Sequence, residues 1–293
     1  MNKPKLKLNI RSPAAGNGDA LKKAAEIKRL HNETFDEAWA RILSMKNSDA
    51  DLRRLREVKA AMEAGVIGRE EGAAGKRFSK AEALRLWRVL EKKRQAEKLR
   101  KMVEETPDNY WLITDAAKLD EFLAIVRNEE KIVFDIESTG VDVWNDYIVG
   151  HVISAVNADI HAYIPTRHDV LDEQLDDKYV LEKLRPIYED GSIGKIAHNA
   201  KYDIHMLANA GVELNGLIWD TQVAMHVLNE NERFQGRSYQ LKELVSYYLK
   251  IPSATYSELF GKKGFNEIPL DVALAYAAKD GEITYKLYEF QRH

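Results

Sequence analysis

The sequence contains no cysteine among its 293 residues. This absence excludes disulfide bonds, thiol nucleophiles, and zinc or iron–sulfur sites held by cysteine. Long apolar runs are also missing, since no stretch approaches the roughly 18 apolar residues that a membrane-spanning helix needs. The basic N-terminal segment has no apolar core like that of a secretory signal peptide. We therefore expect a soluble intracellular protein without membrane contact, cytoplasmic if its source is a bacterium or a virus of bacteria.

Charge is distributed unevenly along the chain, although the net charge is only −3. Residues 1–107 hold 26 Lys and Arg against 16 Asp and Glu, whereas residues 108–293 hold 18 against 31. Such asymmetry favours an anionic partner for the basic part. We expect this part to contact DNA or a replication partner; a solvated helical surface is the alternative.

The basic part has the sequence signals of helices. Ser48 and Gly65 are placed as the N-cap and the C-terminal glycine of one helix. Ser79 and Glu82 have capping-box spacing at the start of a second, longer helix, and the glycine-bearing stretch 71–78 precedes it. We predict a mainly helical accessory region over residues 1–107.

Strand patterns begin after Pro107. The stretches KIVFDIE, YIVGHVISAV and DIHAYIP are rich in β-branched and aromatic residues, and IGKIAHN follows as a fourth, shorter stretch. Helical patterns follow the third strand, and they dominate from DTQVAMHVLN onward. Three successive strands followed by alternating helices and strands predict an α/β fold with a mixed sheet.

Two acids stand at the end of the first of these strands, in FDIESTG. Asp135 and Glu137 are two residues apart, so their side chains point to the same face of the strand. A buried pair of anions is costly unless a positive charge compensates it. Carboxylate oxygens suit Mg²⁺ or Mn²⁺. A solvated strand end remains the alternative for this pair taken alone.

Two further acids have similar alternatives. Asp203, in AHNAKYDIHML, follows Asn199 by four residues and stands where a strand gives way to a helix. It is either a site residue or an acid that the first turn of a helix favours. Asp280 follows Tyr276 by four residues, which places both on one face of a helix. An exposed helical acid is the alternative for Asp280.

Taken together, FDIESTG, HNAKYD and YAAKD resemble, in order and approximate spacing, the three motifs of the DEDD superfamily of 3′–5′ exonucleases. The tyrosine four residues before the last acid marks the tyrosine subclass. AYIPTRHD, DTQVAMHVLN and KGFNEI resemble further segments of the proofreading domain of family A DNA polymerases, the DNA polymerase I type. The resemblance covers residues 108–293 and implies a ribonuclease H-like exonuclease domain there.

The resemblance also implies a site with two divalent cations, Mg²⁺ or Mn²⁺. Its four metal ligands and its water-orienting tyrosine would be Asp135, Glu137, Asp203, Asp280 and Tyr276. Asp135 would bridge the cations, Glu137 and Asp280 would complete the water-activating site, and Asp203 would hold the second cation.

The family also implies three substrate contacts, at positions that match Asn199, Val141 and Phe265. Val141 is smaller than the leucine common at its position in the family. Phe265 either stacks on a terminal base or packs in the core.

The expected activity is removal of nucleotides from a single-stranded or frayed DNA 3′ end. An exoribonuclease of the same superfamily and a polymerase-associated binding module are the alternatives. The sequence stops shortly after the third motif, where family polymerases continue. We expect it to be the amino-terminal part of a longer polymerase, with a stand-alone nuclease as the alternative.

Overall fold

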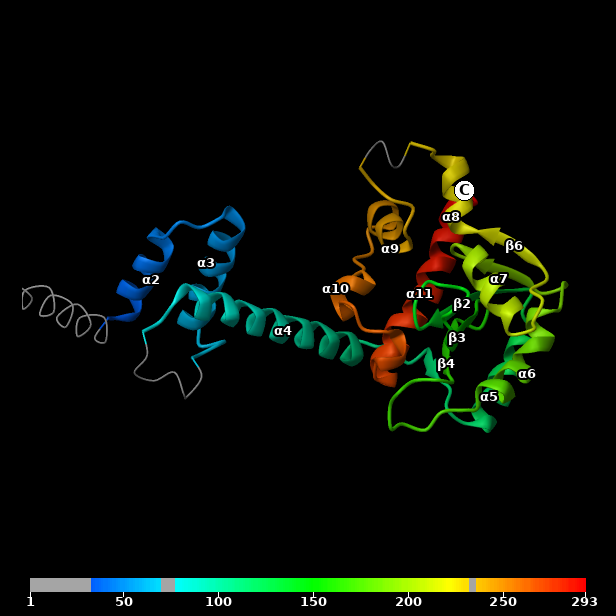
Figure 1. Cartoon of the computed structure of the whole chain (residues 1–293). Coiled ribbons are helices and arrows are strands. Elements are labelled where there is room, and N and C mark those ends of the chain that lie inside the picture. The colour runs from blue at the N-terminus through cyan, green and yellow to red at the C-terminus, as the bar shows by residue number, and fades with distance from the viewer. Residues whose placement is uncertain (1–32, 70–76, 232–235) are drawn as a thin grey trace, which may run out of the picture. The chain divides into compact units, whose positions relative to one another are not determined.

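The computed structural model describes residues 33–69, 77–231 and 236–293 (Figure 1). The chain divides into two compact units, Met1–Arg94 and Gln95–His293. This division falls within helix α4 (Lys80–Glu104), whereas the boundary expected from the sequence follows that helix. The glycine-bearing stretch before α4 lies largely outside the described residues.

The first unit is helical over its described residues. Helix α2 (Phe35–Ser44) begins at a capping box, and α3 (Asp49–Glu63) begins at Ser48, whose hydroxyl accepts a hydrogen bond from the Asp51 amide. Gly65 has a φ of 69°, the left-handed conformation that favours glycine after a helix. These helices and the start of α4 enclose a small core around Trp39, Ile42, Leu55, Val58, Leu86 and Leu90. Within residues 33–69 and 77–104, the expected helical character is confirmed.

The second unit contains a six-stranded mixed sheet in the order β1-β4-β3-β2-β5-β6. The four expected strands are β2 (Lys131–Ser138), β3 (Ile148–Ala155), β4 (Ile160–Pro165) and β5 (Gly194–Ala197). Two short edge strands, β1 (Tyr110–Leu112) and β6 (Leu217–Asp220), were not expected. Strands β2, β3 and β4 pair antiparallel in succession, and the remaining pairs are parallel. The predicted mixed α/β sheet is confirmed.

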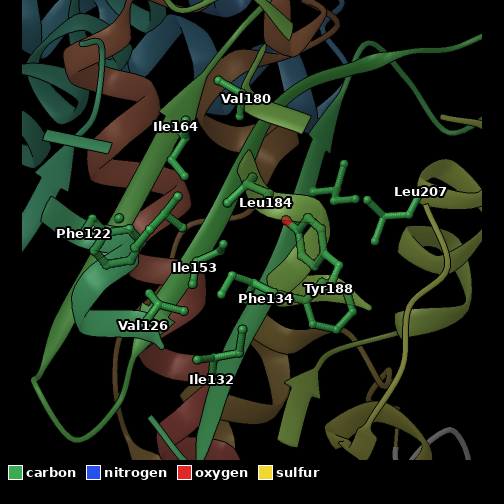
Figure 2. Close-up of a cluster of buried hydrophobic side chains, with 14 of the residues drawn as sticks. Phe122, Val126, Ile132, Phe134, Ile153, Ile164, Val180, Leu184, Tyr188 and Leu207 are labelled. Atoms are coloured by element: carbon green, nitrogen blue, oxygen red, sulfur yellow. The ribbon is translucent and has the colours of Figure 1, made fainter. Parts of the chain in front are cut away.

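Helices cover both faces of the sheet. Helices α5 (Ala116–Val126), α6 (Asp177–Tyr188) and α7 (Ala200–Asn209) pack on one face, where Figure 2 shows Phe134 of β2 against Leu184 and Tyr188 of α6. The opposite face is covered by α11 (Leu270–Gln291). Between α7 and α11 the chain forms α8 (Thr221–Leu228), α9 (Leu241–Leu244), the π-helix η3 (Val245–Leu249), α10 (Tyr256–Phe260) and the 3₁₀-helix η4 (Phe265–Glu267).

The alternation of β2 decides which side chains meet α11. Ile132, Phe134 and Ile136 belong to the core under α5, α6 and α7. The intervening positions therefore point to the α11 face, where Val133 packs with Tyr288. Asp135 and Glu137 follow Val133 on that face. Across the described residues, no helix combines the length and the apolar character needed to cross a membrane.

Candidate metal centre

Three acids meet between the sheet and α11. Asp135 and Glu137 come from the end of β2, and Asp280 comes from α11. One carboxylate oxygen from each lies within 4.8 Å of the other two. Helix α11 comes close to the sheet because Gly281 lies directly against β3, where a Cβ atom would come 2.5 Å from Ser154 Oγ. The structure thus joins the first and third motifs in one cluster.

Asp203 lies beside this cluster without being one of its three members. It stands in the first turn of α7 and is 3% exposed. The Ile136 amide donates to Asp203 Oδ1 at 3.2 Å and to Asp135 Oδ1 at 3.0 Å. The amide between the two β2 acids therefore ties Asp203 to the strand, next to Asp135.

Burial makes Asp135, Glu137 and Asp203 hard to ionise. It raises the pKa of Asp135 to about 6. It also raises the pKa values of Glu137 and Asp203 well above their ordinary range, and the nearby charge of Asp135 adds to both shifts. A positive charge among these carboxylates would oppose the shifts.

A lysine supplies such a charge. Lys242 of α9 forms an ion pair with Asp280, and each side chain is 11% exposed. Its Nζ lies 4.4 Å from the ring centroid of Tyr276. Burial lowers the pKa of Lys242 to about 7, although Glu137 and Asp135 favour its charged form. No motif marked Lys242 in the sequence, because its place beside Asp280 depends on how the chain folds.

Tyr276 lies one helical turn before Asp280 and is 9% exposed. Its ring packs against Phe260, with centroids 5.3 Å apart, and against Tyr256, at 6.0 Å. Burial raises the pKa of its phenol, and the charges of Glu137 and Asp135 raise it further. The phenol therefore stays protonated at neutral pH, as a hydrogen-bond donor or acceptor rather than a base.

The donor set fits a hard divalent cation. All three clustered ligands are carboxylates, which are the preferred ligands of Mg²⁺ and Mn²⁺. The Lys242 ammonium group already takes the place of a cation against Asp280. Asp135, Glu137 and Asp280 could thus hold a metal ion.

The three expected substrate contacts differ in exposure. Val141 lies after β2 and is 90% exposed. Asn199 precedes α7 with a φ of 65°, and its backbone amide donates to Asp220 Oδ1 at 3.1 Å. Phe265 is 2% exposed and packs beside Tyr276, with centroids 6.0 Å apart. For Phe265 the structure shows the core packing that the sequence left as an alternative, with almost no ring surface open to a base.

A cavity of about 470 Å³ borders Tyr276 and Lys242. Its other basic residues are Lys98 and Lys101 of α4 and Lys279 of α11. Glu105 is the one acid among its lining residues. A predominance of lysines suits phosphate groups next to an acidic centre.

Residues 110–291, more than half of the chain, match the model of the 3′–5′ exonuclease family of DNA polymerase A. The chain belongs to this exonuclease family. The resemblance seen in the three motifs is thereby confirmed. The matched exonuclease segment contains all four acids and Tyr276, whereas Lys98 and Lys101 precede it.

Relatives of this exonuclease chain are longer proteins. DNA polymerase I of Pseudomonas aeruginosa is 31% identical over 224 residues, which cover 70% of this chain and 24% of that protein. DNA polymerase I of Chloroflexus aurantiacus is 33% identical over 189 residues, covering 62% of this chain and 19% of that protein. The chain therefore spans about a fifth to a quarter of these relatives.

Among solved structures, RNase D of Trypanosoma brucei in complex with RNA U12 is similar to this exonuclease chain, with a TM-score of 0.52 and 18% identity. The similarity covers 67% of this chain and 66% of that one. At this identity it supports the fold alone.

Proposed function

We propose that this chain removes nucleotides from DNA 3′ ends by metal-dependent hydrolysis, as the proofreading part of a family A DNA polymerase. The observation that carries the proposal is the meeting of Asp135, Glu137 and Asp280 within 4.8 Å, inside a segment that matches the exonuclease family. The relatives named DNA polymerase I favour DNA as the substrate. A polymerase domain would then follow this chain in the full-length protein.

Each acid has a part in this proposal. Asp135 would contact two cations, Mg²⁺ or Mn²⁺, because it lies both in the carboxylate cluster and beside Asp203. Glu137 and Asp280 would complete one site, and Asp203 would serve the other. Bound cations would acidify water and neutralise the phosphate oxygens. Ionised carboxylates would repel the phosphate, so cations held by these acids would favour substrate binding.

Tyr276 would orient the attacking water. Its phenol is protonated at neutral pH, so it would position the water by hydrogen bonding rather than take its proton. Phe260 and Tyr256 hold the ring in place from neighbouring elements. Phe265 would support the ring from the core.

Substrate contacts are proposed for Asn199 and Val141. Asn199 is an exposed polar residue of the second motif, and Val141 is an exposed apolar residue directly after the first motif. The lysines of the cavity beside Tyr276 would attract the phosphates of the strand. Residues 1–107 would contact DNA or a replication partner through their positive charge. For a bacterial or phage protein, this activity belongs in the cytoplasm.

The test of the proposal is digestion of end-labelled single-stranded DNA and RNA with Mg²⁺, Mn²⁺ or a chelator. We expect DNA shortening from the 3′ end with either cation, and none with the chelator. Asp135→Ala should reduce digestion to the level of the chelator control. Asp172→Ala, which removes an exposed acid, should digest as the wild type does.

Two outcomes would favour another function, and a third would overturn the site. Preference for RNA would point to an exoribonuclease, a substrate choice that depends on contacts to the 2′-OH. If neither Mg²⁺ nor Mn²⁺ supports digestion of DNA or RNA, the polymerase-associated binding module is favoured. Normal digestion by a folded Asp135→Ala variant would overturn the assignment of the site.

A further inference from the structure

Lys242 contacts the carboxylate cluster from outside the three motifs. It belongs to α9, whereas the acids come from β2 and α11. Its ammonium group is paired with Asp280, and both side chains are 11% exposed. This is therefore a specific, nearly buried contact, unlike the exposed ion pairs that contribute little.

A lysine and a divalent cation would need the same Asp280 carboxylate here. The three carboxylates each offer an oxygen within 4.8 Å of the others, so the centre of the cluster is small. Two positive charges at such a separation repel each other strongly in a poorly hydrated site. A cation that takes Asp280 as a ligand must therefore displace the ammonium group from it.

The displaced side chain has somewhere to go. Lys242 and Tyr276 both line the cavity of about 470 Å³. The lysine side chain has four flexible methylene groups, so its ammonium group can leave Asp280 while α9 stays in place. The exchange needs a side-chain movement and no refolding of the sheet or of α11.

We propose that Lys242 is an internal cation of this site, which competes with the divalent cation for Asp280 and so weakens metal binding. The competition rests on the proposed function, since it concerns the same carboxylates. The competition adds Lys242 to the residues of the proposed metal site, as the residue that sets the concentration of free cation at which the site is occupied. Lys242 also supplies the positive charge that the cluster requires when no metal ion is bound.

The direct test is a titration of the full 293-residue chain with Mn²⁺ at pH 6, where Lys242, with a pKa of about 7, is mostly charged, and the free ion is measured by electron paramagnetic resonance. Lys242→Met keeps much of the side-chain volume and removes the charge. We expect its Kd for Mn²⁺ at the tightest site to fall by about tenfold or more. Lys178→Met, which removes an exposed lysine of α6, should bind Mn²⁺ within about twofold of the wild type.

A second variant separates charge from packing. Lys242→Arg keeps the positive charge, so it should bind Mn²⁺ no more tightly than the wild type. Thermal unfolding gives a second readout, besides the binding titration, because the chelator arm reports the stability of the metal-free chain and the Mn²⁺ arm reports the stabilisation by the bound ion. In a chelator Lys242→Met should melt at a lower temperature than the wild type, and saturating Mn²⁺ should raise its melting temperature by more than that of the wild type.

The outcomes distinguish this inference from the proposed function. If Lys242→Met binds Mn²⁺ as weakly as the wild type or more weakly, the competition is wrong and the metal site stands. If Lys242→Arg gains affinity as Lys242→Met does, charge is not the cause and the competition is equally wrong. If neither the wild type nor Lys242→Met binds Mn²⁺, the proposed metal site fails and the competition fails with it.

Discussion

Asp203 illustrates how one residue satisfies two local requirements. As an acid in the first turn of α7 it is favoured by the helix dipole, which is what the sequence alone suggests. The same position buries its carboxylate against the Ile136 amide, between the two β2 acids. Its pKa lies well above the ordinary range because burial and Asp135 both disfavour its charge. The interpretation of Asp203 as an acid of the first helical turn was therefore correct, but it did not include the contact of this carboxylate with β2.

His151 gives a pH dependence that does not involve the acids. Burial lowers its pKa to about 4, from 6.5 in the unfolded chain, and its Nδ1 lies 3.0 Å from Tyr188 Oη. Below pH 6.5 the unfolded chain thus binds more protons, so acidification reduces the free energy of unfolding. For this residue the loss at pH 4.5 is about 2–3 kcal/mol. His151→Gln should lose less stability than the wild type between pH 7 and pH 4.5, by that amount, in urea unfolding.

The control for this prediction is His205→Gln, which removes an exposed histidine of α7. The remaining titratable groups are the same in the wild type, His151→Gln and His205→Gln. The comparison is therefore between the losses in free energy of unfolding that the three proteins show from pH 7 to pH 4.5. An equal loss in His151→Gln and in the wild type would mean that His151 is protonated, or hydrated, in the folded chain.

At the scale of elements, the packing of α11 on β3 brings Asp280 to β2. A Cβ at Gly281 would lie 2.5 Å from Ser154 Oγ, which is held by a 2.8 Å hydrogen bond to His161 Nδ1. In an open helix Gly→Ala stabilises by roughly 0.5–1 kcal/mol. Here we expect Gly281→Ala to lower the free energy of unfolding by about 1–3 kcal/mol, because of overpacking. It should also slow digestion, because Asp280 moves away from Asp135.

Two variants test that cause. Ser154→Ala removes the obstructing hydroxyl, so the double variant with Gly281→Ala should lose less stability than the two single changes combined. Gly68→Ala places its Cβ in open space and should change the free energy of unfolding by less than about 0.5 kcal/mol. Additive losses in the double variant would show that the hydroxyl does not cause the strain.

The elements that the sequence predicted are those with local signals. Alternation and β-branched residues marked β2, β3 and β4, and Ser48 and Gly65 marked the ends of α3. Strands β1 and β6 were missed because they have three and four residues, and pairing with β4 and β5 makes them strands. Such short segments carry little pattern of their own.

The site shows the same division between local and tertiary information. The motifs predicted the acids, and the structure brings Asp135, Glu137 and Asp280 together. The contact of Lys242 with Asp280 had no local signal, because it depends on the path of the chain from α8 to α11. The burial of Phe265 was also undecided, since a phenylalanine suits both a core and a base-stacking surface.

At the scale of the whole molecule, the exonuclease unit is longer than the segment that matches its family. The match begins at residue 110, whereas the compact unit begins at Gln95, within α4. Leu99, Met102 and Val103 of this helix pack against the core cluster that contains Tyr276. The last turns of α4 are therefore structural parts of the unit that holds the site.

Truncation tests that assignment. A chain of residues 95–293 keeps these contacts, whereas one of residues 108–293 removes three partly buried apolar side chains. At about 1 kcal/mol for each half-buried side chain, we expect the shorter chain to be less stable by roughly 2–4 kcal/mol in urea unfolding. Its digestion of single-stranded DNA should also be slower, because Tyr276 belongs to the same cluster. Equal stability of the two chains would place the end of α4 outside the exonuclease unit. In that case, a variant of the longer chain with Leu99, Met102 and Val103 all replaced by Ser would be as stable as the unsubstituted longer chain.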